Sequence, residues 1–253
     1  MIERPPQPAR VAWRRAISRD GLWLGLMAAF ALFVSIRLGL WSPWANAAPG
    51  GPLLPNGFAT VDHPFHAARA WTLLQTLRDG GILRWIDDLQ GGYPVEFYPL
   101  GAAWLDAGVW AASLGALPIA AAHSIGVAIV LLAPAVPFAL LARRDGLPLV
   151  VALLAIVAEV VIPGGRYGGG YTELVQWGLV TNVGAAVALL FAFAWSLAWV
   201  EDGSLAALAG AGLAGGLSLV TNPRSFLAFG ASGVGILLAS RVRSDGRALA
   251  PLR

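Results

Sequence analysis

An acid and two histidines stand close together near the start of the longest polar stretch of the chain. Asp62, His63 and His66 fall within one short segment of this 253-residue sequence. A carboxylate of this kind can take a proton from a sugar hydroxyl or ligate a divalent cation such as Mg²⁺ or Mn²⁺. The alternative is that Asp62 only favours the positive N-terminus of a helix. The sequence leaves both roles open.

Further candidates lie in later polar loops. The glycine-rich segment 164–173 carries Arg166 and Glu173. Exposed backbone amides and a guanidinium suit a phosphate, although the spacing matches no P-loop and a flexible linker is the alternative. Arg224 lies in a short loop further on, where its candidate partners are a substrate phosphate or an ordinary lipid headgroup.

Aromatic residues accompany the first polar stretch. Tyr93 and Tyr98 lie among glycines and prolines, close to Asp87, Asp88 and Glu96. Tyrosine prefers the depth of a membrane interface, which suits a rigid loop packed there. Aromatic faces also bind sugar rings, so both tyrosines are candidates for substrate binding as well as for structure.

Three ionisable residues interrupt apolar runs. His123 is expected to be a packed core residue. Glu159 is either a functional group within the membrane or a hydrated group near its outer edge. Asp106 at the middle of a bilayer would cost about 2.5–3.5 kcal/mol, so the run 100–117 is expected to lie along the surface.

The composition predicts an integral membrane protein. Charged residues make up 12% of the chain and apolar residues 57%, whereas soluble domains carry about 25% charged residues. One small soluble core cannot bury so much apolar surface. The absence of cysteine excludes disulfides, thiol catalysis and cysteine-ligated metal sites. A net charge of +3 gives no reason to expect a nucleic-acid partner.

The predicted fold is all-α, a polytopic transmembrane helix bundle of about 6–7 spans. The chain divides into a basic cytoplasmic head, a first transmembrane helix, an extracytoplasmic loop with an amphipathic helix, a helix bundle, and a cytoplasmic tail or truncation point. Their ranges are 1–20, 21–41, 42–99, 100–240 and 241–253. Residues 45–47 resemble a signal-peptidase site, but the length of the first apolar run favours an uncleaved span.

The amphipathic helix of the first loop is expected to begin at Pro64, a residue suited to the first helical position. Its apolar stripe at helical spacing would rest on the membrane surface, with His66 and Arg69 off the stripe. The stripe consists of Ala67, Ala70, Trp71, Leu74 and Leu77.

The arginines favour six crossings with the run 100–117 on the surface. In that arrangement the head, the pair Arg143 and Arg144, and the tail are cytoplasmic, while the polar loops share the outer face. If the run 100–117 also crosses, the positive-inside tendency is broken several times. The tetrapeptide Leu-Val-Thr-Asn occurs at 179–182 and again at 219–222, which is too short to establish an internal repeat.

The segment from Asp62 to Leu100 resembles the first outer loop of the GT-C-fold membrane glycosyltransferases. The resemblance rests on Asp62-x3-His66, on the helix that follows, on Gly80-Gly81-Ile82-Leu83-Arg84-Trp85, and on Gly92-Tyr93-Pro94-x3-Tyr98-Pro99-Leu100. It is nearest to the bacterial multispanning proteins described as related to 6-pyruvoyl-tetrahydropterin synthase, and to YfhO-like proteins. Such proteins are much longer, so this chain is expected to be an N-terminal fragment.

The resemblance implies a cell-envelope enzyme of the bacterial cytoplasmic membrane whose active loop lies outside the cytoplasm. It would transfer a sugar from a polyprenyl-phosphate donor to an extracytoplasmic acceptor. Asp62 would be the catalytic or metal-binding acid, with His66 and Glu173 as further catalytic candidates. Substrate would contact His63, Arg166, Arg224, Tyr93 and Tyr98. The alternative is a non-enzymatic membrane protein that binds or translocates a lipid-linked envelope precursor.

Overall fold

The computed structural model describes residues 9–37, 62–86, 91–95, 98–162 and 170–243, without the side chains of 9–20, 202 and 237–243. The described residues are mostly helical, which confirms the predicted fold class at the level of secondary structure. The elements are α1 (Ala9–Arg37), α2 (His63–Arg78), β1 (Trp85–Ile86), β2 (Tyr93–Pro94), α3 (Gly101–Ala112), α4 (Ile119–Leu132), α5 (Ala135–Arg144), α6 (Val150–Val161), the π-helix η3 (Thr172–Gln176), α7 (Val180–Asp202), α8 (Leu205–Thr221) and α9 (Ser225–Arg243).

Two helices are long and apolar enough to cross a membrane by length and composition. They are Ile119–Arg144, which joins α4 to α5, and Val180–Glu201 within α7. Four further apolar helices are shorter, at Gly21–Arg37, Val150–Val161, Leu205–Thr221 and Ser225–Ile236.

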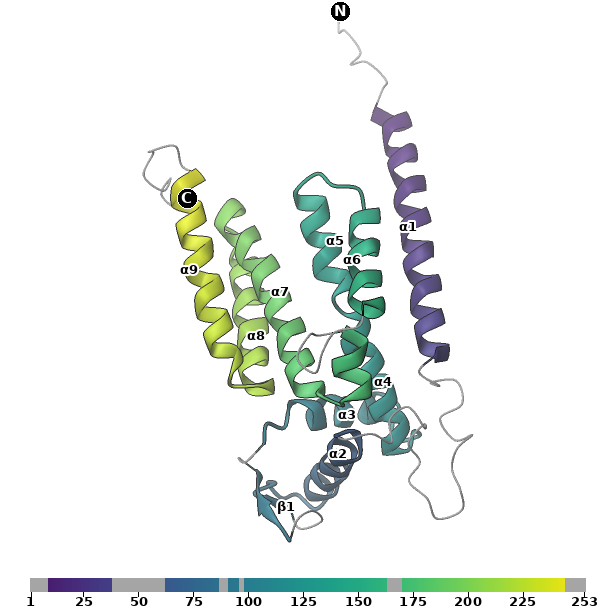
Figure 1. Cartoon of the computed structure of the whole chain (residues 1–253), viewed down its shortest axis with the longest axis vertical. Coiled ribbons are helices and arrows are strands. Elements are labelled where there is room, and N and C mark those ends of the chain that lie inside the picture. Colours follow the sequence, from purple (N-terminus) through teal and green to yellow (C-terminus); the bar gives the residue numbers. More distant parts are fainter. Residues whose placement is uncertain (1–8, 38–61, 87–90, 96–97, 163–169, 244–253) are drawn as a thin grey trace, which may run out of the picture.

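The longer helices run roughly side by side, and α2, α3 and the small hairpin form a separate layer at one end of them (Figure 1). The strands β1 and β2 pair antiparallel, with Ile86 opposite Tyr93. The chain enters α1 and leaves α9 at the other end of the molecule (Figure 1). Polar segments far apart in the sequence therefore meet where this layer joins the long helices.

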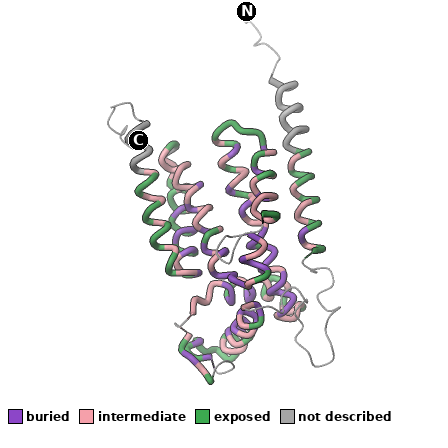
Figure 2. The backbone as a smooth tube through the Cα atoms, viewed as in Figure 1, coloured by how far each residue is buried: buried purple, intermediate pink, exposed green. Residues whose placement is uncertain are grey.

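The helix α3 has 12 residues and spans about 18 Å at the helical rise of 1.5 Å per residue, the same length as the 12-residue α6. It lies in the layer at one end of the long helices (Figure 1). It packs against α2 on one side and α4 on the other. Buried residues are concentrated where these three helices meet (Figure 2).

The start of α2 is as predicted, with a proline in its first turn, but its buried face differs from the predicted stripe. Trp71 and Leu77 are exposed, while His66 and Arg69 are 1% exposed. The periodicity of apolar residues missed these two because hydrogen bonds and aromatic rings, rather than apolar character, hold them inside.

Candidate functional site

Asp62 lies where the first polar loop meets the segment before α7. It occupies the N-cap position of α2, yet its side chain makes no capping hydrogen bond. Gly178 packs directly on this end of α2, since a Cβ on Gly178 would lie 2.8 Å from the nitrogen of His63 and 3.2 Å from the Cβ of Asp62. The φ of Gly178 is +72°, a conformation that favours glycine. The contact brings Asp62 to the start of α7.

A chain of hydrogen bonds runs from α3 through α4 and α2 to η3. The Oδ2 of Asp106 lies 2.7 Å from Nδ1 of His123. The Nε2 of His123 lies 2.8 Å from Nδ1 of His63. The Nε2 of His63 lies 2.9 Å from the carbonyl oxygen of Val175. All three side chains are at most 1% exposed, so the chain is closed to solvent at both ends.

The Val175 carbonyl determines how many protons the chain holds. A carbonyl oxygen can only accept, so Nε2 of His63 carries a proton and donates it. Each of the other two bonds also needs one proton between its two heavy atoms. Three bonds thus hold three protons, and Asp106, His123 and His63 are neutral as a group. The His63 to Val175 proton sits on His63 in every such arrangement.

Burial agrees with this neutral assignment. Desolvation, with a smaller contribution from His123, lowers the pKa of His63 to about 4. Desolvation also raises the pKa of Asp106, although the bond to His123 opposes it. The second carboxyl oxygen of Asp106 is buried without a hydrogen-bond partner in the described part of the chain. An unpartnered oxygen costs less on a protonated carboxyl than on a carboxylate.

His66 is a neutral positioning residue in this structure. Its Nε2 donates to the carbonyl of Gly178 at 3.1 Å, and burial holds the pKa of its imidazole well below the usual range. With the side chain 1% exposed, a substrate does not reach the ring. The contact between His66 and Gly178 instead fixes the position of Asp62. It favours a structural role for His66 over the catalytic role expected from the sequence.

Arg69 holds the loop after β2 onto α2. Its Nη2 donates to the carbonyls of Val95 and Tyr98. The guanidinium carbon lies 5.2 Å from the ring centre of Phe65, 5.8 Å from that of Tyr93 and 5.3 Å from that of Tyr98. Cation–π contacts of this kind stabilise a buried arginine. Tyr93 is buried in this cluster, so its structural role is shown and a role in binding substrate is not supported.

A polar rim lies at the start of α7 and the end of α8. It consists of Tyr98, Thr181, Asn182, Asn222 and Arg224. The Tyr98 hydroxyl lies 3.1 Å from Oγ1 of Thr181, and the Asn222 amide donates to Oδ1 of Asn182 at 2.6 Å. The backbone N–H of Arg224 donates to Oδ1 of Asn222 at 3.0 Å. Arg224 itself is exposed.

Both copies of the Leu-Val-Thr-Asn tetrapeptide contribute to this rim. Each supplies its asparagine to the Asn182–Asn222 pair, and Thr181 and Thr221 lie beside the segment 98–101. The two copies of the tetrapeptide therefore contact each other through their asparagines.

Beneath the polar rim lies an apolar cavity between α3, α4, α7 and α8. Its volume is about 210 Å³. Its lining includes Val180 and Thr221, which are next to rim residues in the chain, and continues along α4 and α7 through residues such as Ile129, Gly184, Ala188 and Phe191. The combination of rim and cavity fits a molecule with a polar head and a long apolar tail.

The other candidates are placed as follows. Glu173 is buried in η3 with 6% exposure, so it is not open to substrate in this structure. Arg166, Asp87, Asp88 and Glu96 lie outside the described residues. Glu159 accepts a hydrogen bond from the backbone of Gly170 at 2.9 Å, which gives it a structural role at the end of the second polar loop. His63 is buried in the proton chain rather than facing substrate.

The described histidines, aspartates and glutamates include no group of three that could hold a metal ion. The described residues alone therefore do not complete a cation site around Asp62.

Sequence reasoning missed the partnership of Asp106 with His123 and the burial of Arg69. Each residue was visible as an ionisable group in an apolar setting. Their contacts depend on how α2, α3 and α4 cross, which local periodicity does not contain. The spacing of Asp106 and His123 in two consecutive short helices was the available signal.

Comparison of this chain with protein-family models, with curated proteins and with solved structures gave no match.

Proposed function

We propose that the protein is a GT-C-like membrane glycosyltransferase that uses a polyprenyl-phosphate-linked sugar and acts on the outer face of a bacterial cytoplasmic membrane. The observation that carries the proposal is the polar rim at the end of an apolar cavity, with Asp62 held at the start of α7 beside it. A polyprenyl chain suits the cavity, and a sugar phosphate suits the rim.

Exposed apolar side chains support placement in a membrane. Leu154, Leu213, Phe226 and Leu227 are 62–77% exposed, on helices outside the layer of α2 and α3 (Figure 1). Large exposed apolar surfaces of this kind are costly in water and suited to lipid. We propose six passes, through α1, α4–α5, α6, α7, α8 and α9, with α3 lying at the outer surface.

In the transfer step Asp62 removes the proton of the acceptor hydroxyl. The acceptor oxygen forms a bond to the anomeric carbon as the bond from that carbon to the phosphate oxygen breaks. The electron pair of the broken bond leaves with the polyprenyl phosphate. Arg224, the exposed cation of the rim, offsets the charge that grows on that phosphate.

A second candidate is a non-enzymatic protein that binds or translocates a lipid-linked envelope precursor. The specific observation in its favour is that His63, His66 and Glu173 are all buried. Among the described catalytic candidates, Asp62 is then the one that a substrate can reach. Binding needs only the cavity and the rim.

The substitution Asp62→Asn tests the proposal. The purified chain is incubated with a polyprenyl-phosphate hexose and a membrane extract as the source of acceptors, and release of polyprenyl phosphate is measured. We expect the variant to lose about 10²–10⁴-fold in rate, because general-base catalysis contributes that much. Binding of polyprenyl phosphate should be unchanged.

Asp79→Asn is the matched control, since Asp79 is an exposed carboxylate at the other end of α2. If the unaltered protein binds polyprenyl phosphate but releases none from the donor, the second candidate is right. If it neither binds nor releases polyprenyl phosphate, both candidates are wrong.

A further inference from the structure

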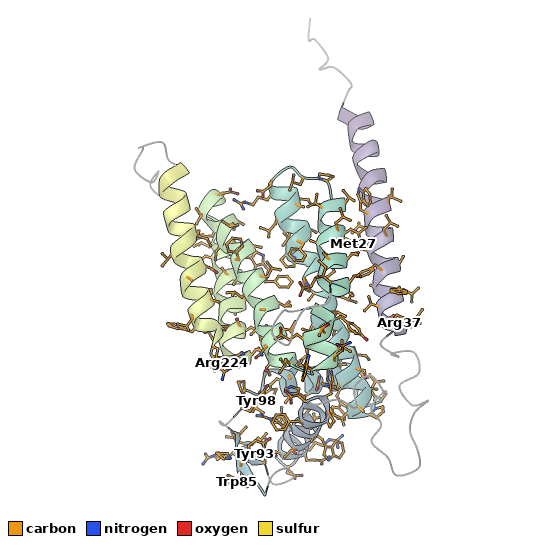
Figure 3. The ribbon with its side chains drawn as sticks, viewed as in Figure 1. Met27, Arg37, Trp85, Tyr93, Tyr98 and Arg224 are labelled. Atoms are coloured by element: carbon orange, nitrogen blue, oxygen red, sulfur yellow. The ribbon has the colours of Figure 1, made fainter. Side chains whose placement is uncertain are left out.

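A second groove lies on the opposite side of the bundle from the polar rim, between α1 and α5. Its walls are apolar side chains of the two helices, among them Leu24, Met27, Val136 and Leu140, and its volume is about 220 Å³. Met27 projects from α1 toward the neighbouring helices (Figure 3). The helix α1 packs only lightly on the rest of the molecule. Among the described side chains of α1, Val34 alone is buried.

One end of this groove carries a positive charge. Arg143 lines it and lies in the last turn of α5. The neighbouring Arg144 is held by Glu201 through two hydrogen bonds, at 2.7 Å and 2.5 Å. Arg144 thus contacts α7 through Glu201, and Arg143 lines the groove. The groove therefore combines an apolar length with a guanidinium at its end.

The dimensions fit one leaflet of a bilayer. From Ala135 to Arg143 the groove follows α5 for about 12 Å, at 1.5 Å per residue. Half of a hydrocarbon core is about 15 Å thick. An acyl chain lying along α5 would thus place its headgroup at Arg143. The positive-inside tendency puts this end on the cytoplasmic side, where the leaflet is rich in anionic lipids.

We propose that the groove between α1 and α5 binds an anionic phospholipid of the cytoplasmic leaflet, with one acyl chain against Met27 and Leu140 and its phosphate on Arg143. The bound lipid completes the packing of α1 against the bundle. The inference rests on the membrane placement given under the proposed function, but not on glycosyl transfer.

Thermal unfolding of the full chain in detergent tests the proposal, with added phosphatidylglycerol compared against phosphatidylcholine of the same acyl chains. We expect phosphatidylglycerol to raise the Tm by about 2–4 °C more than phosphatidylcholine does. Arg143→Gln should abolish this difference. Arg84→Gln, which removes an exposed arginine just before β1 at the other end of the molecule, should retain it.

Native mass spectrometry gives an independent readout. Ala139→Trp fills the groove, since Ala139 lines it, and should reduce the retained phosphatidylglycerol about tenfold relative to the unaltered protein. Equal stabilisation by the two lipids, or a phosphatidylglycerol preference that survives Arg143→Gln, overturns the inference while leaving the proposed function standing. Recovery of the chain in the soluble fraction without detergent overturns both. Loss of sugar transfer with retained lipid preference overturns the proposed enzyme alone.

Discussion

At the residue scale, the carbonyl of Val175 determines the protonation of three side chains that are distant in sequence. Because it accepts from His63, the bond between His63 and His123 and the bond between His123 and Asp106 must each hold a single proton. A fourth proton would place two donors face to face. This chain of hydrogen bonds therefore holds α2 against η3 at neutral pH, and it weakens in acid.

This gives a prediction about pH. The pKa of His63 is about 4 in the folded protein, against an ordinary value of 6.5, so the unfolded chain binds more protons between these two values. Stability should therefore fall as the pH drops from about 6.5 to about 4, by up to about 3 kcal/mol from His63. Burial of His66 acts in the same direction. Chemical unfolding in detergent at a series of pH values measures the loss.

The variant His63→Gln is the control for that experiment. It should be less stable at pH 7 and show a shallower dependence on pH, since one of the two histidines with a lowered pKa is gone. An unchanged slope would show that His63 does not carry the effect.

A second prediction separates the possible positions of the proton between Asp106 and His123. Asp106→Asn keeps a donor toward His123 Nδ1 and should cost less than about 1 kcal/mol. His123→Leu leaves Asp106 and His63 without this partner and should cost about 2–4 kcal/mol. Unfolding midpoints of the two variants give the comparison. Equal losses would mean that Asp106 is a carboxylate beside a charged His123, which an amide cannot replace.

The element scale shows what sequence patterns can and cannot predict. The predicted apolar runs agree with the start of α2 at its early proline and with the apolar helices after residue 118. These features could be predicted because helix ends and apolar periodicity are local properties. The buried face of α2 was predicted less well. Arg69 is inside because three rings and two carbonyls surround it. Two of the rings and both carbonyls come from residues 93–98, about 25 residues away in the sequence.

Contacts between elements can be tested on α3 with two glycines. A Cβ at Gly101 would lie 2.7 Å from the Cα of Thr221 in α8, whereas nothing lies within 4 Å of one at Gly108. Gly101→Ala should therefore cost about 1–3 kcal/mol, since backbone must move to admit the methyl group. Gly108→Ala should be neutral or stabilise by up to about 1 kcal/mol. Thermal unfolding of both variants decides whether α3 packs on α8 as described.

At the scale of the whole molecule, the site depends on polar segments meeting at one end. The sequence predicted this grouping from the distribution of arginines, but it did not predict the cavity beneath the rim. That cavity requires α3, α4, α7 and α8 to leave a space between them, which follows from small residues such as Gly184 and Ala188 at their contacts and not from any motif.

The grouping predicts a pattern of accessibility in intact cells. The chain has no native cysteine, so single cysteines can be placed at the exposed positions Asp79, Gln176, Arg224 and Asp145. The first three should react with an impermeant thiol reagent from outside, and Asp145→Cys should react only after permeabilisation. Labelling of Gln176→Cys and Arg224→Cys only after permeabilisation, with Asp79→Cys labelled from outside, would mean that α3 crosses the membrane.

The three-proton chain also makes the buried layer electrically responsive. If each shared proton moves one step toward His63, the net charge of the group stays zero, but Asp106 becomes negative and His63 positive. This shift needs no exchange with solvent. Because His63 adjoins Asp62 in the chain, a negative charge arriving near Asp62 favours the shifted arrangement. The two proton arrangements therefore differ in dipole at the same net charge, and the burial of Asp106 and His63 favours the arrangement without separated charges.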